Sequence, residues 1–252
     1  TAYDELPYRA APIEWTAPER LALASLLHGG PRIELSAGYR VLELGCADGA
    51  NLLPMAWFRR HASFVGIDGA RTQIQRARAR AAALGLENLE YLHADFTTAD
   101  ARLAGQFDFI VAHGVFSWIS RPARDALLEL CQRRLRPEGL LYLSYNARPG
   151  WNVRGMVREF LLAQTAGIAD LRARVDAARD VCRRLVDAMG GEEHAYRRLM
   201  IDELRLVASG DPSYVAHEHL TPDNHAYWRS ELAALLDARG LAYVADADFD
   251  QP

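Results

Sequence analysis

Residues 41–51 read Val-Leu-Glu-Leu-Gly-Cys-Ala-Asp-Gly-Ala-Asn, and no other stretch of this sequence is as informative. Its first four residues, Val41–Leu44, form an apolar run that is typical of a buried strand. The small residues between Gly45 and Gly49 predict a tight loop, and a helical segment, 51–60, follows. A strand, a tight loop and a helix N-terminus in this order make a cradle for a nucleotide-like ligand.

Glu43 lies two residues before the first glycine of this loop and carries a negative charge into the cradle. A dinucleotide-binding loop leaves its helix N-terminus open to a pyrophosphate, which a carboxylate would repel. A carboxylate instead suits a ligand that has a cationic amino group and no phosphate, such as S-adenosylmethionine (SAM). The sequence therefore favours SAM over NAD, with S-adenosylhomocysteine as the product. A nucleotide-dependent oxidoreductase is the alternative, but the chain has no G-x-G-x-x-G pattern.

The composition excludes several classes of function. Half of the 252 residues are hydrophobic, which supports a full core, and the net charge of −4 provides no basic field for nucleic acid. All 29 basic residues are arginine, so Schiff-base, pyridoxal-phosphate and Walker-type chemistry, which need lysine, are excluded. Cys46, Cys131 and Cys182 match no zinc spacing and suggest no disulfide framework. No apolar run is long enough to span a membrane, so we expect a cytoplasmic protein without nucleic-acid or membrane partners.

Short apolar runs alternate with helical segments along residues 41–145. Such alternation predicts a mainly parallel sheet with helices on both faces, a Rossmann-like, doubly wound α/β fold. The expected strands are Val41–Leu44, Ser63–Ile67, Leu89–His93, Phe107–Ala112 and Leu140–Tyr145, and the expected helices are Glu19–His28, 51–60, Arg71–Leu84, Thr98–Ala104 and Pro122–Leu135.

The pattern changes after Trp151. Apolar residues then recur at helical spacing as far as Met189, with an arginine-rich opposite face, and Gly167 is expected to break this stretch into two helices. The remaining expected elements are the helices Glu193–Ala208 and Ser230–Arg239 and a strand, Leu241–Ala245, that resumes the sheet. We therefore expect a lid segment (1–17), a cofactor-binding core (18–150 with 212–252) and an all-helical insertion after the fifth strand (151–211).

Polar side chains follow the carboxyl ends of the next strands, where ligands bind in open α/β sheets. Asp68 ends the second strand, 19 residues after Gly49, where an acid is placed to bind ribose hydroxyls. Asp95 follows the third strand and is placed to accept a bond from an adenine amino group, with Phe96 flanking the ring. Each acid has a plainer alternative, because Asp68 also suits a helix N-cap and Asp95 a turn. His113 follows the fourth strand at the same edge.

The segments Val41–Asn51, Gly66–Asp68 and Ala94–Phe96 resemble the successive motifs of class I SAM-dependent methyltransferases, which usually have glycine where this chain has Ala47. The blocks His113–Trp118 and Ser144–Trp151 are similar to those of bacterial methyltransferases with a methyltransferase regulatory domain. Asp4–Tyr8 and His217–Leu220 also fit that group, which includes protein-lysine methyltransferases of outer-membrane proteins. Members of the group often have a further C-terminal domain, which this chain would lack. The resemblance implies methyl transfer from SAM to a nitrogen or oxygen nucleophile, with a protein lysine as the favoured acceptor.

The strand ends and the resemblance together define the expected sites. The expected cofactor-binding residues are Tyr8, Glu43, Gly45, Cys46, Ala47, Asp48, Gly49, Asn51, Asp68, Gln73, Asp95, Phe96, His113, Gly114 and Val115. The acceptor is expected to meet Trp118, Tyr145, Asn146 and Trp151, whose rings and amide can align an amine and exclude water from it. Core packing is the alternative for each ring. The role of His113 is open between proton acceptor, cofactor contact and packed turn residue.

Two further segments carry expectations about ligands. The aromatic- and proline-rich segment Tyr3–Trp15 is expected to fold over the cofactor as a lid. His217, Glu218, His219 and His225 lack the spacing of a zinc motif, and neighbours on a strand point in opposite directions, so no metal is expected. A protein or peptide acceptor is favoured over a small molecule, and a non-catalytic SAM-binding or interaction module is the rival class.

Overall fold

The computed structural model describes residues 5–7, 10–189 and 194–248. The chain divides into two compact units. The sheet unit consists of residues 10–145 and 227–252, and the helical unit consists of residues 1–9 and 146–226. The sheet unit has two hydrophobic cores and the helical unit has a third, and the two units are described separately below.

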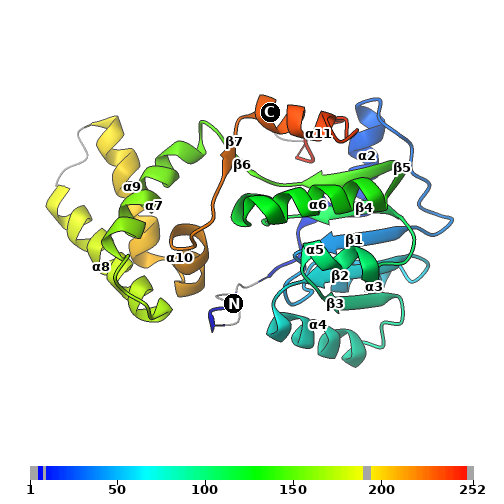
Figure 1. The fold of residues 1–252 in the computed structure, drawn as a ribbon, viewed down its shortest axis with the longest axis horizontal. Helices are drawn as coiled ribbons and strands as arrows, with labels where there is room; N and C mark the ends of the chain where they lie inside the picture. Colours follow the sequence, from blue (N-terminus) through cyan, green and yellow to red (C-terminus); the bar gives the residue numbers. More distant parts are fainter. Residues whose placement is uncertain (1–4, 8–9, 190–193, 249–252) are drawn as a thin grey trace. The chain divides into compact units, whose positions relative to one another are not determined.

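Five parallel strands form the sheet of the first unit, in the order β3-β2-β1-β4-β5 (Figure 1). The strands are β1 Arg40–Leu44, β2 Ser63–Asp68, β3 Leu89–His93, β4 Phe107–Ala112 and β5 Leu135–Leu143. The order of winding reverses between β1 and β4, and ligands of doubly wound sheets bind beyond the carboxyl ends of the strands at such a switch point. The predicted Rossmann-like fold is confirmed.

Helices cover both faces of this sheet. Successive residues of a strand point to opposite faces, so Val41 of β1 belongs to one hydrophobic core and Leu42 to the other. The first core contains side chains of α2 Pro18–Leu27, α3 Leu52–Phe58 and α4 Arg71–Ala83, and the second contains side chains of α5 Phe96–Ala99, α6 Arg121–Arg134 and α11 Arg229–Asp237. The apolar side of each helix thus packs against one face of the sheet.

The helical unit is built from four helices around a third core. These are α7 Trp151–Gln164, α8 Leu171–Met189, α9 Ala195–Ser209 and α10 Pro212–His219. Gly167 lies between α7 and α8, as the sequence predicts. The short strands β6 Asn146–Ala147 and β7 Ala226–Tyr227 pair where the chain passes between the units. None of the helices in the described ranges has the length and apolarity that crossing a bilayer requires.

The expected sixth strand, Leu241–Ala245, is not formed, which corrects the sequence prediction. The helix α11 ends at Asp237, Gly240 follows it with a φ of +72°, and the next segment makes local contacts in place of a strand ladder. The Tyr243 ring lies 4.7 Å from the guanidinium carbon of Arg229, and its hydroxyl bonds to Asp246 at 2.9 Å. An apolar five-residue run is too short a signal to distinguish a strand from such a loop.

The residues 217–219 lie on a helix, α10, and not on a strand as expected. Asp211 accepts a hydrogen bond from the Ser213 backbone nitrogen at 2.9 Å, and Pro212 occupies the first helical turn. An aspartate followed by proline is a helix-start signal that was readable in the sequence. The sequence assigned residues 212–226 to the core with the sheet, whereas α10 packs against α7 and α8.

Two other element boundaries differ from expectation. The fifth strand begins at Leu135, directly after α6, and ends at Leu143, whereas the expected strand covered residues 140–145. A register shift between Phe107 and Phe109 of the neighbouring strand accommodates its irregular first half. The helix expected at Thr98–Ala104 is instead α5 followed by a 3-10 turn, Asp100–Arg102, because Asp95 caps the helix earlier.

Candidate functional site

The loop after β1 has two glycines in a backbone conformation that other residues rarely adopt. Gly45 and Gly49 both have a φ of +78°. A Cβ atom on Gly45 would lie 2.3 Å from Cγ2 of Val115, and one on Gly49 would lie 2.2 Å from the Tyr91 hydroxyl. That hydroxyl donates a 3.0 Å hydrogen bond to the Gly49 carbonyl. The tight loop predicted from the sequence is therefore packed between β3 and the loop that follows β4.

Ala47 stands between the two glycines and has a φ of +45°, which is unfavourable for a residue with a Cβ atom. Its backbone nitrogen donates a 2.9 Å hydrogen bond to Asp68 Oδ2 at the end of β2. The other oxygen of Asp68 accepts a 2.7 Å bond from the Ala70 backbone nitrogen. Asp68 is not the N-cap of α4, because that position belongs to Ala70. Asp68 therefore holds the loop after β1 and the loop after β2 together.

Glu43 is a buried carboxylate on β1, with only 4% of its surface exposed. Its Oε1 accepts a 2.7 Å hydrogen bond from Asn51 Nδ2. Its Oε2 is buried and has no hydrogen-bond partner among the described residues. Burial raises the pKa of Glu43 to about 7, against the Asn51 bond that lowers it, and the charge of Asp68 raises it further. A buried acid without a cation beside it favours its neutral form, so a cationic ligand group at Oε2 would favour the charged form.

Asn51 connects Glu43 to the N-terminal part of the sheet unit. Its Oδ1 accepts hydrogen bonds from the Ile13 backbone nitrogen at 2.8 Å and from the Thr16 hydroxyl at 3.3 Å. Thr16, which is fully buried, ends the 3-10 helix Glu14–Thr16. The amide of Asn51 therefore lies in a network with Glu43 on one side and residues 13–16 on the other. Residues 13–16 of the expected lid lie beside the loop, while Tyr3 and Tyr8 lie outside the described residues.

The end of β3 offers a different arrangement. Asp95 is the N-cap of α5, and its Oδ1 accepts bonds from the Thr97 backbone nitrogen at 2.9 Å and the Thr97 hydroxyl at 2.7 Å. The capping alternative therefore accounts for one oxygen of this exposed carboxylate. Phe96 follows as the first residue of α5 and packs partly buried against the second core. Contact of either residue with adenine stays a prediction.

The end of β4 brings a histidine to the same edge of the sheet. His113 Nδ1 lies 3.0 Å from the Tyr142 hydroxyl, and the two rings stack with their centroids 5.8 Å apart. Burial lowers the pKa of His113, so its ring is neutral near pH 7. Gly114, with a φ of +64°, donates its backbone N–H to the Ser144 hydroxyl at 2.7 Å. Tyr142 of β5 and Ser144, which follows β5, thus hold residues 113–114 in place.

Three other expected cofactor residues lie in this part of the sheet unit. Cys46 is buried in the loop, and burial raises the pKa of its thiol well above the ordinary value. Asp48 forms an ion pair with Arg80 of α4 at 2.7 Å. Gln73 is buried in the first turn of α4. Contact of any of these three residues with a cofactor stays a prediction.

The four expected acceptor residues are divided between the two units. Trp118, in the 3-10 helix Phe116–Trp118, and Tyr145, two residues after β5, belong to the sheet unit. Asn146 of β6 and Trp151, the first residue of α7, belong to the helical unit. The Trp151 ring lies 5.1 Å from the guanidinium carbon of Arg154. A common acceptor site for the four stays a prediction.

Sequence reasoning missed two residues that support the candidate site, Tyr142 of β5 and Tyr91 of β3. Tyr142 supports His113, and Tyr91 supports Gly49. A period-2 reading of residues 140–145 would have placed Tyr142 and Ser144 on one face of the strand, next to the expected site. The pairing with β4 that brings Tyr142 to His113 is not visible in the sequence.

The histidines of α10 belong to the helical unit and are arranged as core residues. His217 Nε2 lies 2.6 Å from the Leu6 carbonyl oxygen, and the fully buried ring of His219 meets the Tyr214 ring edge-on at 5.9 Å. Burial lowers the pKa of His219 to about 4, and the charges of Arg154 and Arg158 add to this effect. In the described ranges, no cluster of three or more His, Cys, Asp or Glu side chains is placed to hold a metal ion.

Comparison with known protein families and structures extends this description. Residues 41–139 match the family model described as "Methyltransferase domain", and residues 211–251 match the "Predicted methyltransferase regulatory domain". Protein RP789 of Rickettsia prowazekii is 34% identical over 98% of this chain and 44% of its own length. A second protein of that organism, RP028, is 28% identical over 87% of this chain and 87% of its own length.

A solved structure also matches most of the chain. The structure of PKMT2 from Rickettsia typhi in complex with AdoHcy has a TM-score of 0.83 and 29% identity, covering 96% of this chain and 46% of PKMT2. The chain thus spans about half the length of PKMT2 and of RP789.

The five-stranded fold and these matches define the class of protein, a methyltransferase with a Rossmann-like sheet. More particularly, the chain combines a match to a methyltransferase domain with a match to a predicted methyltransferase regulatory domain.

Proposed function

We propose that this chain binds SAM at the carboxyl edge of β1, β2 and β4 and transfers its methyl group to a nitrogen of a protein substrate, a lysine side chain being the favoured acceptor. The observation that carries the proposal is Glu43, whose Oε2 is buried and has no hydrogen-bond partner among the described residues. Such an oxygen fits a ligand with an ammonium group and no phosphate, because a cation offsets the cost of a buried carboxylate.

The other side chains at this edge suit the neutral parts of the same ligand. Asp68 is proposed to accept bonds from ribose hydroxyls, since its bonds to the Ala47 and Ala70 backbone nitrogens hold its carboxylate at this edge. Gly45 and Gly49 place no Cβ atom where the loop approaches Val115 and Tyr91. When bound, SAM supplies an activated methyl group on a sulfonium, and this chemistry belongs to the cofactor.

The protein's part in such a reaction is to align the acceptor, to exclude water and to accept a proton. An ammonium acceptor must lose a proton before it can attack, and a neutral imidazole is a suitable base. His113 is neutral near pH 7 and is held by Tyr142 through Nδ1. We assign it either this role or a cofactor contact. Trp118, Tyr145, Asn146 and Trp151 are the proposed groups that orient the acceptor.

A protein lysine is favoured as the acceptor because of the likeness to PKMT2, whose name denotes a protein lysine methyltransferase. A small molecule or a short peptide is the second candidate acceptor. This chain is also 37% identical, over 42% of its length, to a ubiquinone biosynthesis O-methyltransferase of Dinoroseobacter shibae. The alternative from a different class of function is a module that binds SAM without catalysing methyl transfer.

One experiment separates these candidates. The chain is incubated with SAM carrying an isotopically labelled methyl group and with proteins of a bacterial lysate, and labelled peptides are located by mass spectrometry. Label on lysine residues, lost in a Glu43→Ala variant, supports the proposal. Label only in small molecules moves the acceptor to that class. Binding of SAM by calorimetry without label in any fraction favours the non-catalytic module.

A further inference from the structure

The two ring nitrogens of His113 have different surroundings. Nδ1 lies 3.0 Å from the Tyr142 hydroxyl, whereas Nε2 makes no hydrogen bond within the described part of the chain. The residue is half-buried, and Nε2 is not among the enclosed atoms that lack a partner, so a ligand can reach it. A neutral imidazole carries a single N–H, and the nitrogen that holds it decides whether His113 donates to a ligand or accepts a proton from it.

The Tyr142 hydroxyl has one hydrogen-bond partner in the described ranges, His113 Nδ1. A phenol O–H is a stronger donor than a neutral imidazole N–H, and an imidazole nitrogen is a stronger acceptor than a phenol oxygen. Burial raises the pKa of the Tyr142 phenol, and the charge of Asp248 raises it further, so the phenol keeps its proton at neutral pH. The hydroxyl therefore donates to Nδ1, and the single imidazole proton lies on Nε2.

Strand pairing holds the two rings in this arrangement. Tyr142 of β5 lies beside Val111 of β4 in the sheet, two residues before His113. The rings of His113 and Tyr142 stack with 26° between their planes. Ser144 bonds to the next residue of the loop, because its hydroxyl accepts the Gly114 N–H at 2.7 Å. Rotation of the imidazole by half a turn would bring a carbon to the Tyr142 hydroxyl and leave that donor unpaired, which is costly in a half-buried position.

Asp248 is the other group that the Tyr142 hydroxyl could be expected to meet. Its charge acts on Tyr142, but no hydrogen bond joins the two residues. The Asp248 carboxylate instead lies 3.8 Å from the Arg20 guanidinium. The O–H of Tyr142 is therefore not drawn away from His113 by this carboxylate.

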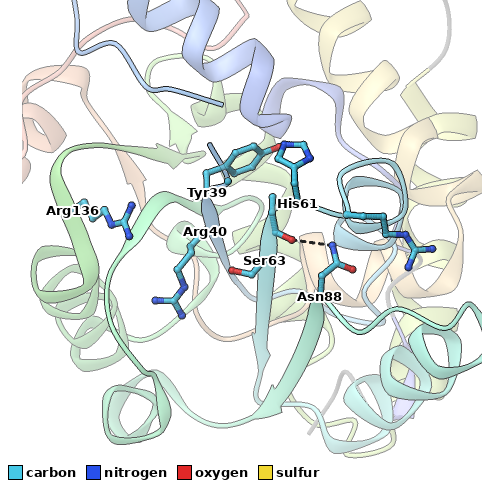
Figure 2. A pocket seen from close by; sticks show the side chains of 9 residues that line it. Tyr39, Arg40, His61, Ser63, Asn88 and Arg136 are labelled. Carbon is cyan, nitrogen blue, oxygen red and sulfur yellow. Dashed lines mark hydrogen bonds between the residues drawn. The ribbon is translucent and has the colours of Figure 1, made fainter. Parts of the chain in front are cut away.

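The carboxyl edge of the sheet has a use for a donor. Glu43, Asp68 and Asp95 lie near the ends of β1, β2 and β3, and ionised carboxylates accept hydrogen bonds but donate none. Arg40 and Arg136 lie near the amino ends of β1 and β5, where they line a cavity of about 400 Å³ (Figure 2). Because the strands are parallel, these two arginines belong to the opposite edge of the sheet. An oxygen of a ligand at the carboxyl edge therefore requires donors such as an imidazole N–H.

We infer that His113 donates a hydrogen bond from Nε2 to a ligand oxygen and is not the proton acceptor of the reaction, with Tyr142 as the positioning residue that fixes its tautomer. The inference rests on the proposed methyl transfer and decides between the two roles left open for His113. Nε2 already holds the proton and Nδ1 is covered by the Tyr142 hydroxyl, so neither nitrogen offers a lone pair to an ammonium group. The oxygen belongs to the carboxylate of SAM or to a carbonyl of the protein acceptor.

Nuclear magnetic resonance tests the tautomer without any activity. Long-range proton–nitrogen correlations are recorded at pH 7.5 on the whole chain with labelled histidine, and the His113 signals are assigned by their loss in His113→Gln. We expect one protonated nitrogen, Nε2, and one unprotonated nitrogen, Nδ1. Tyr142→Phe keeps the stacked ring and should show a mixture of both tautomers, whereas Asp248→Asn should match the unchanged chain. A proton on Nδ1 in the unchanged chain, or a single unchanged tautomer in Tyr142→Phe, would overturn the inference.

Calorimetry with SAM and with decarboxylated SAM locates the ligand oxygen. If Nε2 bonds to the SAM carboxylate, His113→Ala should weaken SAM binding about tenfold and leave the binding of decarboxylated SAM unchanged. If it bonds to the protein acceptor, both affinities stay unchanged, and the half-saturating concentration of lysate protein in the labelling experiment rises about tenfold. His113→Gln places an amide N–H near the position of Nε2, so its loss should be smaller than that of His113→Ala in either case.

Two kinetic results would also overturn the inference. One is a loss of the methyl-transfer rate that is equally large in His113→Gln and His113→Ala at saturating SAM and acceptor, because a missing base affects both variants alike. The other is unchanged binding of both ligands in His113→Ala. If the unchanged chain transfers no label at all, the proposed function fails while the tautomer and SAM measurements still stand. Thermal unfolding of each variant verifies that it is folded.

Discussion

Asn51 Nδ2 donates a 2.7 Å hydrogen bond to Glu43 Oε1, and the Oδ1 of the same amide accepts the backbone N–H of Ile13. Asn51 therefore links the acid of the β1 strand to the N-terminal segment of the sheet unit. The link leaves Glu43 Oε2 buried and without a hydrogen-bond partner in the described part of the chain. The Asn51 amide therefore connects the protonation of the Glu43 carboxylate to the position of residues 13–16. The first two predictions follow from this connection.

Glu43→Gln should stabilise the protein without ligand at alkaline pH. The pKa of Glu43 in the folded chain is about 7, above the ordinary value of 4.5, so the folded state holds this proton longer than the unfolded state. The contribution of Glu43 to the free energy of unfolding therefore falls as the pH rises from 4.5 to 7. At pH 8 the variant should be more stable by up to about 3 kcal/mol, and at pH 4 the two should be alike. Urea unfolding at both pH values measures this. An identical pH dependence in the two proteins would contradict it.

Deletion of residues 1–17 should weaken SAM binding while unfolding stays cooperative. The deletion removes Ile13 and Thr16, which hold the Asn51 amide, and the remainder of the expected lid. Thr16→Val is the finer variant, because it keeps the buried shape and removes only the hydroxyl, which contacts the Ile13 carbonyl and the Asn51 amide. Calorimetry with SAM should show a larger loss for the deletion than for Thr16→Val. SAM affinity equal to that of the full chain would reject the lid.

Asp68→Ala should weaken SAM binding by roughly 1.5–3 kcal/mol, the usual loss when a charged acceptor of ribose hydroxyls is removed. Because Asp68 also bonds to the backbone nitrogens of Ala47 and Ala70, the variant should be less stable as well. Asp68→Asn is the control, since its amide oxygen retains one of these bonds. Affinity is measured by calorimetry well below the unfolding temperature of each variant. An unchanged affinity in Asp68→Ala would reject the ribose role.

Ala47→Gly should raise the free energy of unfolding by about 1 kcal/mol, because glycine adopts a positive φ without the steric cost that Ala47 has at +45°. Ala79→Gly, on the exposed side of α4, should lower it by a similar amount, since glycine is unfavourable inside a helix. Chemical denaturation compares the two variants. A loss of stability in both would show that the loop does not need a left-handed residue at this position.

Asn146→Ala and Trp151→Ala should lower turnover on a true acceptor much more than they lower SAM affinity. Both residues are assigned to the acceptor and neither to the donor. The measurement compares kcat and KM for the acceptor with the Kd for SAM in each variant. Wild-type turnover in both would remove them from the site, and the segment His217–His219 would then be the next to test.

Local pattern determined most of the sheet unit. Four of the five strands were predicted within one residue at each end, because short apolar runs between helical segments are a direct sign of buried parallel strands. The two-glycine loop after Val41–Leu44 was predicted for the same reason, since small residues next to a strand end predict a tight turn. The sequence also predicted the break between α7 and α8 at Gly167. Each of these features depends on residues that are neighbours in the chain.

Only the tertiary structure decided the features that depend on distant residues. Val115 and Tyr91 lie against Gly45 and Gly49, and Ile13 meets Asn51, across separations that no local pattern records. The same holds for Leu241–Ala245, where an apolar run without a strand to pair with became a loop. A strand exists only when another strand satisfies its backbone hydrogen bonds. Whether an apolar run forms a strand is therefore determined by strand pairing and not by the propensity of its residues alone. The burial that raises the pKa of Glu43 is likewise a property of the folded sheet, although the acid itself was visible in the sequence.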